Sequence, residues 1–554
     1  MAVTRLDRLQ RRLLRLLGIV ALSLAISGCA NTQPLRPGNS WTHPGELRWA
    51  GIGDIDNLDP LLSSLSSAKD IAHLWCGYMF VWGDEDSWVP DLATGIPTQA
   101  NKGISADGMR VTYHLRHKVK WQDGVPFTSE DVAFTVRAIM NRENNVPSRV
   151  GYDDILSLQT PDKYTVIVNL RHPLSSFIAT FLTEAECVLP AHLLESVPDL
   201  NTASFSSRPI GTGPFRVVRY NRGESVELEA NDSYWRGAPK LKRIIYSIVP
   251  SDSGAVLEIR THEVDFVHGV SPAAARELIP RNEPPPKGTK IYLTAVNTRV
   301  ELAFNTHSAI VRDANVRTAL SLATNARDIV HKLSNDVNIE AGSDQRPGSF
   351  WADPALSKHP YNLASAKKLL DRAGWIQSSD GFRYRRGEPL DIQITAGADR
   401  PAIQAIEILL QQQWQAIGIR SHIKNYSVSQ LYATYASGGI VRAGKFEVAL
   451  IGWELGVDPD ESALLLCSNI PPRGSNLYRL CDSVIDRSEA SGLSSYDERV
   501  RRAAYFRVQH EVRSAVPFVV LYYSRSIDVT NSDFMGFKPR HIGSPSWNSW
   551  QWSI

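Results

Sequence analysis

Several short segments alternate between apolar and polar residues, as expected for β-strands with one buried face. Apolar residues occupy every second position in residues 111–115, 164–170 and 446–450. Residues 518–522 form an unbroken apolar run, which is typical of a strand buried on both faces. These four segments predict that part of the fold is a β-sheet.

Other segments repeat apolar residues every three or four positions, which predicts amphipathic helices. Thr128 and Asp131 have the spacing of a capping box and begin the first helix. Asn362 can cap a second helix, which Gly374 ends. The three apolar faces comprise Val132, Val136, Ile139 and Met140; Ala366, Leu369, Leu370 and Ala373; and Ile406, Leu409, Leu410 and Ile417. Strands and helices together predict an α/β protein.

The first 28 residues have the organisation of a secretory signal peptide. Five arginines between Arg5 and Arg15 precede an apolar run, residues 16–26, and Cys29 follows the small residues Ser27 and Gly28. The run is too short to cross a hydrocarbon layer of about 30 Å as a helix. It resembles a bacterial lipoprotein signal, which implies cleavage before Cys29, acylation of that cysteine and export. Residues 29–45 then read as a flexible tether.

Composition limits the class of protein. A chain of 554 residues is expected to form two or three domains. Loss of the signal would change the net charge from +2 to about −2, because five arginines and one aspartate are removed. Such a neutral surface gives no electrostatic reason to expect nucleic acid as a partner. No apolar segment after residue 26 is long enough to span a bilayer.

Four cysteines remain after Cys29, and in an exported protein they are candidates for disulfides. Cys467 and Cys481 lie close in sequence, and a bond between them would close a loop of about fifteen residues. We favour this pair. Cys76 and Cys187 lie in apolar surroundings, and their residues leave open whether they pair or remain buried thiols.

Catalytic motifs are incomplete wherever they begin. Residues 439–445 copy the spacing of a P-loop, but Phe446 replaces the required hydroxyl residue. The His-Glu pairs at residues 262–263 and 510–511 lack the second histidine of a zinc protease. We therefore expect no enzyme, no cofactor and no metal site.

Six motifs resemble the bacterial extracellular solute-binding protein family 5, whose members serve peptide and nickel ABC importers. The motifs follow one another in the family's order over nearly the whole chain. They are SADGMRVTYHLRHKVKWQDGVPFTSEDVAF at 105–134, PIGTGPF at 209–215, NDSYWRGAP at 231–239, Phe304-Asn305 with the helix pattern after it, PYNLASAKKLLDRAGW at 360–375, and Gly452-Trp453 with Asp458-Pro459-Asp460.

The resemblance implies the fold of a type II periplasmic binding protein, in which two α/β lobes are joined by a hinge. One lobe carries an inserted subdomain. The implied boundaries are residues 46–88, 210–299 and 518–554 for lobe one, 89–209 for the inserted subdomain and 300–517 for lobe two.

The resemblance also implies a ligand site. In peptide-binding members the backbone around Gly452 and Trp453 pairs with an extended peptide. An acid three residues after the tryptophan commonly receives the ligand's ammonium, but this chain has Gly456 there. Glu454 or Asp458 could take over that role; otherwise the ligand lacks a free amino terminus.

Each of these residues also has a structural alternative. Trp453 could be a core aromatic residue, and Asp458 and Asp460 fit a turn and a helix cap. From lobe one the resemblance implies that Asp59 lies near the cleft entrance, although Asp59-Pro60 also reads as a turn. The family's dipeptide binders have a disulfide in a loop like residues 465–482, which supports the pair Cys467 and Cys481.

The function implied is a monomeric, lipid-anchored component that captures peptides or other small solutes outside the cytoplasm, in the periplasm or at the outer face of the cytoplasmic membrane. It would deliver them to the permease of an ABC importer. A sensor module, a binder of a sugar or nickel complex, and an exported hydrolase on the same scaffold are the alternatives.

Overall fold

The computed structural model describes residues 38–278, 285–398 and 401–554. Residues 43–554 form one compact unit. Among the described residues, no helix combines the length and apolar character that crossing a membrane requires. We keep the names lobe one, inserted subdomain and lobe two for the segments expected above.

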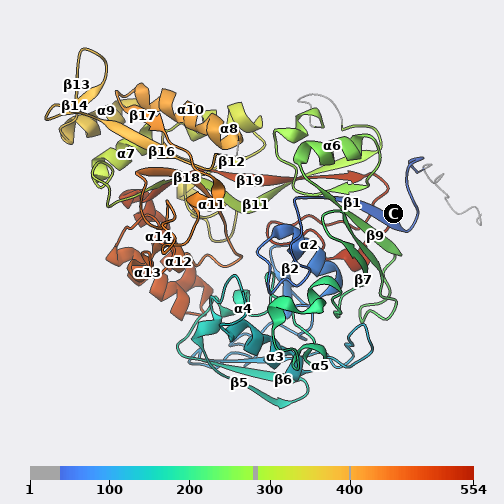
Figure 1. The fold of residues 1–554 in the computed structure, drawn as a ribbon. Coiled ribbons are helices and arrows are strands. Elements are labelled where there is room, and N and C mark those ends of the chain that lie inside the picture. The colour runs from blue at the N-terminus through green and yellow to red at the C-terminus, as the bar shows by residue number, and fades with distance from the viewer. Residues whose placement is uncertain (1–37, 279–284, 399–400) are drawn as a thin grey trace, which may run out of the picture. The chain divides into compact units, whose positions relative to one another are not determined.

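A mixed sheet of eleven strands organises this part of the chain. Two long antiparallel strands, β11 (Thr289–Phe304) and β19 (Phe518–Asn531), lie at its centre (Figure 1). On the lobe-two side follow β18 (Val448–Glu454), β16 (Asp391–Thr395) and β17 (Arg420–Ile423), while β12 (Ile339–Glu340) pairs with β19. On the lobe-one side follow β10 (Phe266–Val267), β1 (Glu46–Ile52), β9 (Arg243–Val249), β8 (Ser225–Ala230) and β7 (Phe215–Asn221).

The inserted subdomain has a sheet of its own. It consists of β4 (Arg110–His114), β6 (Thr165–Leu170) and β5 (Ile155–Asp162), in this order. The predicted strands at residues 111–115 and 164–170 are thereby confirmed within one residue at each end. Alternate side chains of β6 are fully buried, as the two-residue period requires. The hairpin of β2 (Phe80–Trp82) and β3 (Trp88–Pro90) lies at the boundary between lobe one and this subdomain.

The predicted helices are also present. Helix α3 (Ser129–Met140) begins where the Thr128 N–H donates to Asp131 Oδ2 at 2.8 Å. Met140 is 38% exposed, because it is the last residue of this helix and lies beyond the packed face. The remaining longer helices are α2 (Ser66–Trp75), α6 (Asp252–Arg260), α7 (Ala314–Ala323), α8 (Ala326–Ser334), α9 (Leu363–Arg372), α10 (Pro401–Gln415), α13 (Ser483–Ser494) and α14 (Glu498–Ala515).

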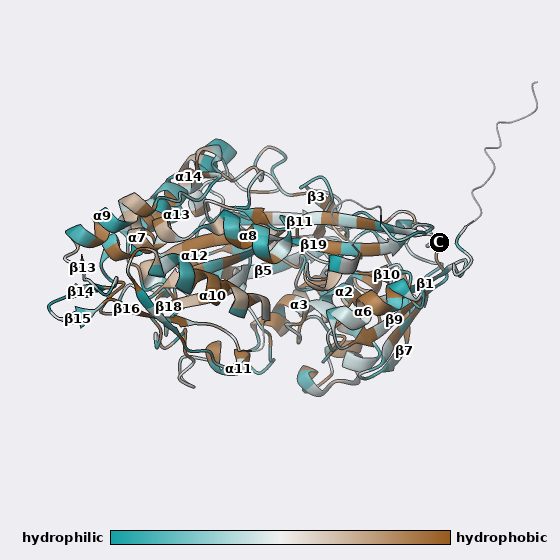
Figure 2. Ribbon diagram, turned by 90° about the horizontal axis from the view of Figure 1, so that it is seen from above, coloured by the Kyte–Doolittle hydropathy of each residue, from teal (hydrophilic) through white to brown (hydrophobic). Residues whose placement is uncertain are grey.

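Hydrophobic side chains pack on both faces of the central sheet. In lobe two, the inward side chains of α10 and β16 share one core that includes Trp414 and Ile392. In lobe one, Trp49 of β1 contacts Phe266 of β10 in another core. Figure 2 shows brown, hydrophobic stretches along β11 and β19, which contribute to the cores of both lobes.

Candidate ligand-binding site

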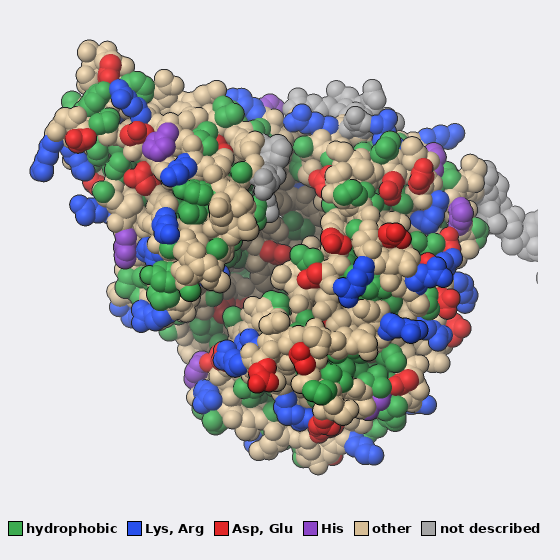
Figure 3. Space-filling view, in the orientation of Figure 1, with side chains coloured by type: hydrophobic (Ala, Val, Ile, Leu, Met, Phe, Trp, Pro, Cys, Tyr) green, Lys and Arg blue, Asp and Glu red, His purple; other side chains and the backbone are tan. Residues whose placement is uncertain are grey.

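Two adjoining cavities flank the loop that follows β18, residues 455–461. The smaller cavity has a volume of about 340 Å³ and the larger a volume of about 440 Å³. Both are lined by Asn297, Leu455 and Ile542, so they share a wall. Figure 3 shows a recess on one face of the molecule with acidic side chains, in red, inside it.

An irregularity in β11 gives this loop its position. Ala295 of β11 faces Arg525 of β19, but the next pair is Arg299 with Tyr523, so three residues of β11 lie opposite a single residue of β19. Such a bulge bends a strand and redirects its side chains. Asn297 lies in the bulge and therefore leaves the regular ladder of hydrogen bonds.

Asn297 connects three parts of the site. Its carbonyl accepts a hydrogen bond from the Leu455 N–H at 2.9 Å, and its Nδ2 donates to the Gly456 carbonyl at 2.9 Å. Its Oδ1 accepts from Arg346 Nε at 2.8 Å. The bulge of the central strand thus fixes both the loop after β18 and an arginine of lobe two.

The smaller cavity is lined from both lobes. Trp82 and Asp86 come from the β2–β3 hairpin, and Arg346 and Trp351 come from lobe two. The loop at residues 455–461 completes the wall and contributes Asp458, Asp460 and Glu461.

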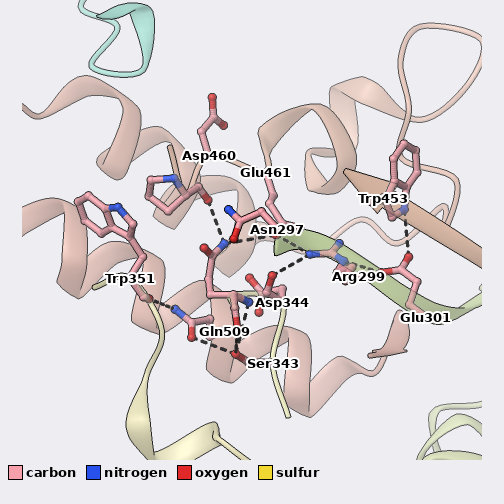
Figure 4. A network of polar contacts seen from close by, with 12 residues as sticks. Asn297, Arg299, Glu301, Ser343, Asp344, Trp351, Trp453, Asp460, Glu461 and Gln509 are labelled. Carbon is pink, nitrogen blue, oxygen red and sulfur yellow. Dashed lines mark hydrogen bonds and ion pairs between the residues drawn. The ribbon is translucent and has the colours of Figure 1, made fainter. Parts of the chain in front are cut away.

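A buried ionic cluster lies behind this cavity (Figure 4). Arg299 is fully buried, and its Nε donates to Glu301 Oε2 at 2.7 Å while its Nη1 donates to Glu461 Oε1 at 2.5 Å. Glu301 also accepts a hydrogen bond from Trp453 Nε1 at 3.1 Å. Burial raises the pKa of Glu461 to about 8 although Arg299 opposes the shift. The guanidinium of Arg299 therefore limits how far burial shifts Glu461 toward its neutral form.

The cluster contains more acids than bases. Asp344 and Glu489 are buried, and burial raises the pKa of both, that of Asp344 to about 6. Within the described part of the chain, neither oxygen of Glu489 has a hydrogen-bond partner, which favours the neutral form of this side chain. The wall of the smaller cavity is thus backed by an acidic interior.

Asp458 and Asp460 differ in how their charge is compensated. Both oxygens of Asp458 accept from Arg501 Nη2, at 2.6 and 2.7 Å. Asp460 accepts from the Ser462 N–H at 2.9 Å, and burial together with Asp458 raises its pKa. Among the described residues, no cation forms an ion pair with Asp460, so it is the acid of this loop that can accept a positive group.

The larger cavity has a mixed charge. Arg540 binds both oxygens of Glu184 at 2.8 Å. Burial raises the pKa of Asp70 to about 6. Burial lowers the pKa of His268, but the Asp528 carboxylate at 2.7 Å outweighs this effect and raises it to about 8. Positive and negative groups therefore face the same space.

The residues that the sequence places in the site form two groups. Gly452, Trp453 and Glu454 end β18, and Glu454 lines the larger cavity while Asp458 and Asp460 line the smaller one. Trp453 lines neither cavity and packs against the core of lobe two. Asp59 also lies away from both cavities.

Asp59 has the geometry of a turn residue. Its side chain is buried and accepts a hydrogen bond from the Leu61 N–H at 3.0 Å. Burial raises its pKa to about 6, and the backbone hydrogen bond opposes this shift. In the form of the protein described here, the Asp59 side chain stabilises its own turn and lines neither cavity.

The described residues contain two disulfides. Cys467 is joined to Cys481, with a Cα–Cα distance of 4.6 Å. Cys76 is joined to Cys187, with a Cα–Cα distance of 6.1 Å, which decides a pairing that the sequence left open. Cys29 lies outside the described residues.

The sequence analysis missed Arg346, Asn297 and the buried pair of Arg299 with Glu301. Arg346 and Asn297 carry no local signal, because each lies in an irregular segment. Arg299 and Glu301 did carry a local signal in the sequence. They are charged residues at alternate positions of an otherwise apolar strand, and such residues are rarely buried unless they are paired.

Comparison with known proteins identifies the class. The model of bacterial extracellular solute-binding proteins, family 5, matches residues 87–470. The chain belongs to this family, which consists of solute-binding proteins and not of enzymes. The predicted family and the predicted fold of a type II periplasmic binding protein are confirmed.

Relatives match along nearly the whole chain. The oligopeptide-binding protein AppA of Bacillus subtilis is 23% identical over 96% of this chain and 97% of its own length. The di/tripeptide-binding protein 2 of Pseudomonas aeruginosa is 25% identical over 82% of this chain and 85% of its own length. The structure of NikZ from Campylobacter jejuni with Ni(L-His) is 26% identical, has a TM-score of 0.77 and covers 93% of this chain, with all of NikZ matched.

Proposed function

We propose that this chain is the solute-binding component of an ABC importer, which captures peptides or peptide-sized solutes between its lobes and delivers them to a membrane permease. The observation that carries the proposal is the loop at residues 455–461, which lies between two cavities lined from both lobes. Relatives named as oligopeptide- and di/tripeptide-binding proteins favour peptides.

Closure of the lobes supplies the mechanism. A ligand contacts both lobes only when they are closed, so its binding shifts the equilibrium toward the closed form. The two strands that connect the lobes, β11 and β19, are irregular beside Asn297, where a small change in backbone angles moves one lobe against the other. The closed form is then the form that a permease recognises.

Native mass spectrometry of the protein isolated without denaturation tests this proposal. A heterogeneous set of short peptides released from the protein is the expected result. A single non-peptide mass would replace peptides with another solute, such as a metal complex of the kind bound by NikZ. Failure to bind any peptide or other small solute would contradict the proposal.

Asp460 is proposed as the acceptor of a ligand's ammonium group, in place of an acid at Gly456. Asp460→Asn is expected to weaken binding of trialanine about tenfold or more, because a hydrogen bond to a charged group is worth about 1.5–3 kcal/mol. Isothermal titration calorimetry measures this loss. Glu498→Gln is the control, since Glu498 lines the same cavity but is exposed. An equal loss for N-acetyl-trialanine, which has no ammonium, would contradict the assignment.

We also propose that the mature protein is anchored to a membrane through lipid on Cys29. Replacement by serine removes the thiol that carries the lipid, so Cys29→Ser is expected to move the protein from the membrane fraction to the soluble fraction. Immunoblotting of the two fractions measures the change. Cys29→Ser protein that stays with the membrane would contradict the anchor.

A further inference from the structure

An arginine that lines the smaller cavity forms an ion pair with a carboxylate of the protein itself. Arg346 of lobe two is 7% exposed, and its Nη2 lies 3.3 Å from Asp86 Oδ2, on the β2–β3 hairpin. Among the described residues, Asp86 is the acid that pairs with Arg346. Both residues line the cavity, so their bridge crosses the space where a ligand would bind.

Hydrogen bonds fix Arg346 in a position that suits the binding of an anion. Its Nε is fixed by Asn297 at 2.8 Å, and its backbone carbonyl accepts from the Ser349 N–H at 3.0 Å. A guanidinium fixed in this way presents a planar set of donors that suits a carboxylate. Asp86 does not fill this set of donors, since a single hydrogen bond slightly longer than the usual range joins it to Arg346.

Asp86 can leave this bridge at little cost. Its side chain is 42% exposed, so water can solvate the Asp86 carboxylate when the bridge opens, while a carboxylate of the ligand takes its place on Arg346, which is 7% exposed. Asp86 Oδ1 accepts from Trp82 Nε1 at 3.3 Å, and His541 Nε2 lies 3.7 Å from the Oδ2 that Arg346 binds. After displacement, the carboxylate would still have these partners and water.

The hairpin that carries Asp86 is fixed to lobe one. Lys538 pairs with Asp84 at 3.2 Å, and Arg540 Nη1 donates to the Trp82 carbonyl at 2.5 Å. Asp86 therefore moves with lobe one, whereas Arg346 moves with lobe two. The bridge forms only when the lobes approach each other, which is the geometry that a ligand would also produce.

We propose that Asp86 is an internal competitor of the ligand: it occupies Arg346 when the cavity is empty, and a carboxylate of the ligand displaces it. The inference rests on the proposed function and specifies its ligand class, solutes that carry a carboxylate. In a peptide this group is either the free carboxyl terminus or an acidic side chain.

Binding of three peptides separates these sources. The probes are trialanine, trialanine amide and Ala-Ala-Glu amide, titrated by calorimetry into the full-length protein and its variants. We expect the wild type to bind at least one of the two peptides with a carboxylate about tenfold more tightly than trialanine amide. Preference for trialanine assigns the carboxyl terminus, and preference for Ala-Ala-Glu amide assigns the side chain.

Asp86→Asn tests the competition directly. Asp86 has a φ of +50°, a conformation that asparagine tolerates, so the hairpin should keep its shape. The variant is expected to bind the preferred peptide two- to fivefold more tightly and trialanine amide unchanged. Arg346→Gln should abolish the preference, and Asp86→Asn should then add no gain. Glu85→Gln, an exposed acid of the same turn, is the matched control and should change nothing.

The outcomes distinguish this inference from the proposed function. Equal affinity of the wild type for all three peptides, or an equal gain for all three in Asp86→Asn, would overturn the inference and leave peptide capture standing. Binding of none of the peptides to wild type or variant would contradict both. Binding of a carboxylate peptide to Asp86→Asn alone would support the inference strongly.

Discussion

Replacing Arg299 by methionine is expected to lower the free energy of unfolding by about 3–5 kcal/mol, because buried acids lose their cation. Arg299 is fully buried, and its guanidinium binds Glu301 and Glu461 at 2.7 and 2.5 Å. Among the described residues, neither acid forms an ion pair with any other cation. Methionine preserves most of the side-chain volume, so the loss should come from charge. Denaturant titration of both proteins measures it.

The loss should depend on pH in a defined direction. Burial raises the pKa of Glu461 from an ordinary value near 4.5 to about 8 in the folded protein. The folded state therefore binds the proton more tightly, and this contribution to stability is lost as the pH rises from about 5 through 8. Without Arg299 this pKa rises further. The deficit of Arg299→Met should thus be smaller at pH 5 than at pH 8.

Two further variants identify the cause of the loss. Adding Glu461→Gln to Arg299→Met should restore part of the stability at pH 8, because an amide folds into the interior without the proton that the buried Glu461 carboxyl must take up. Arg137→Met, which breaks ion pairs of an arginine that is 53% exposed, should cost less than about 1 kcal/mol. A deficit that is the same at pH 5 and pH 8 would contradict the electrostatic explanation.

The sequence predicts elements well where their residues face a core on a regular period. Helix α3 is an example, since both its capping box and its apolar face follow from local spacing. Strand β19 shows the limit. Its predicted part, residues 518–522, is apolar, but the strand continues to Asn531 through Ser524, Arg525 and Ser526. These polar residues line the larger cavity, so the apolar signal ends where the strand crosses the cleft.

The candidate site divides in the same way. Resemblance to a family directs attention to the segment that contains Glu454, Asp458 and Asp460, and the structure places all three on the cavities. The ion pair in the smaller cavity was not predictable from the sequence. Arg346 and Asp86 are 260 residues apart in sequence, and no local pattern links them. Their relation follows only from the arrangement of the two lobes.

Removing the disulfide between Cys76 and Cys187 is expected to lower the free energy of unfolding by about 4–5 kcal/mol, the entropic value for a loop of roughly one hundred residues. The two cysteines are 111 residues apart, and both are buried. Their bond joins the end of α2 in lobe one to the inserted subdomain. Its loss would let these two segments separate in the unfolded chain and leave two small gaps in the core.

The second disulfide supplies the matched comparison. Cys467 and Cys481 are 14 residues apart, so their removal should cost only about 3 kcal/mol in the same entropic account. We therefore expect the pair Cys76→Ala and Cys187→Ala to be less stable in denaturant titration than the pair Cys467→Ala and Cys481→Ala. Equal losses, or a larger loss for the short loop, would mean that local packing and not loop length governs what these bonds contribute. The long loop would then give no reason to regard the first bond as the main link between lobe one and the inserted subdomain.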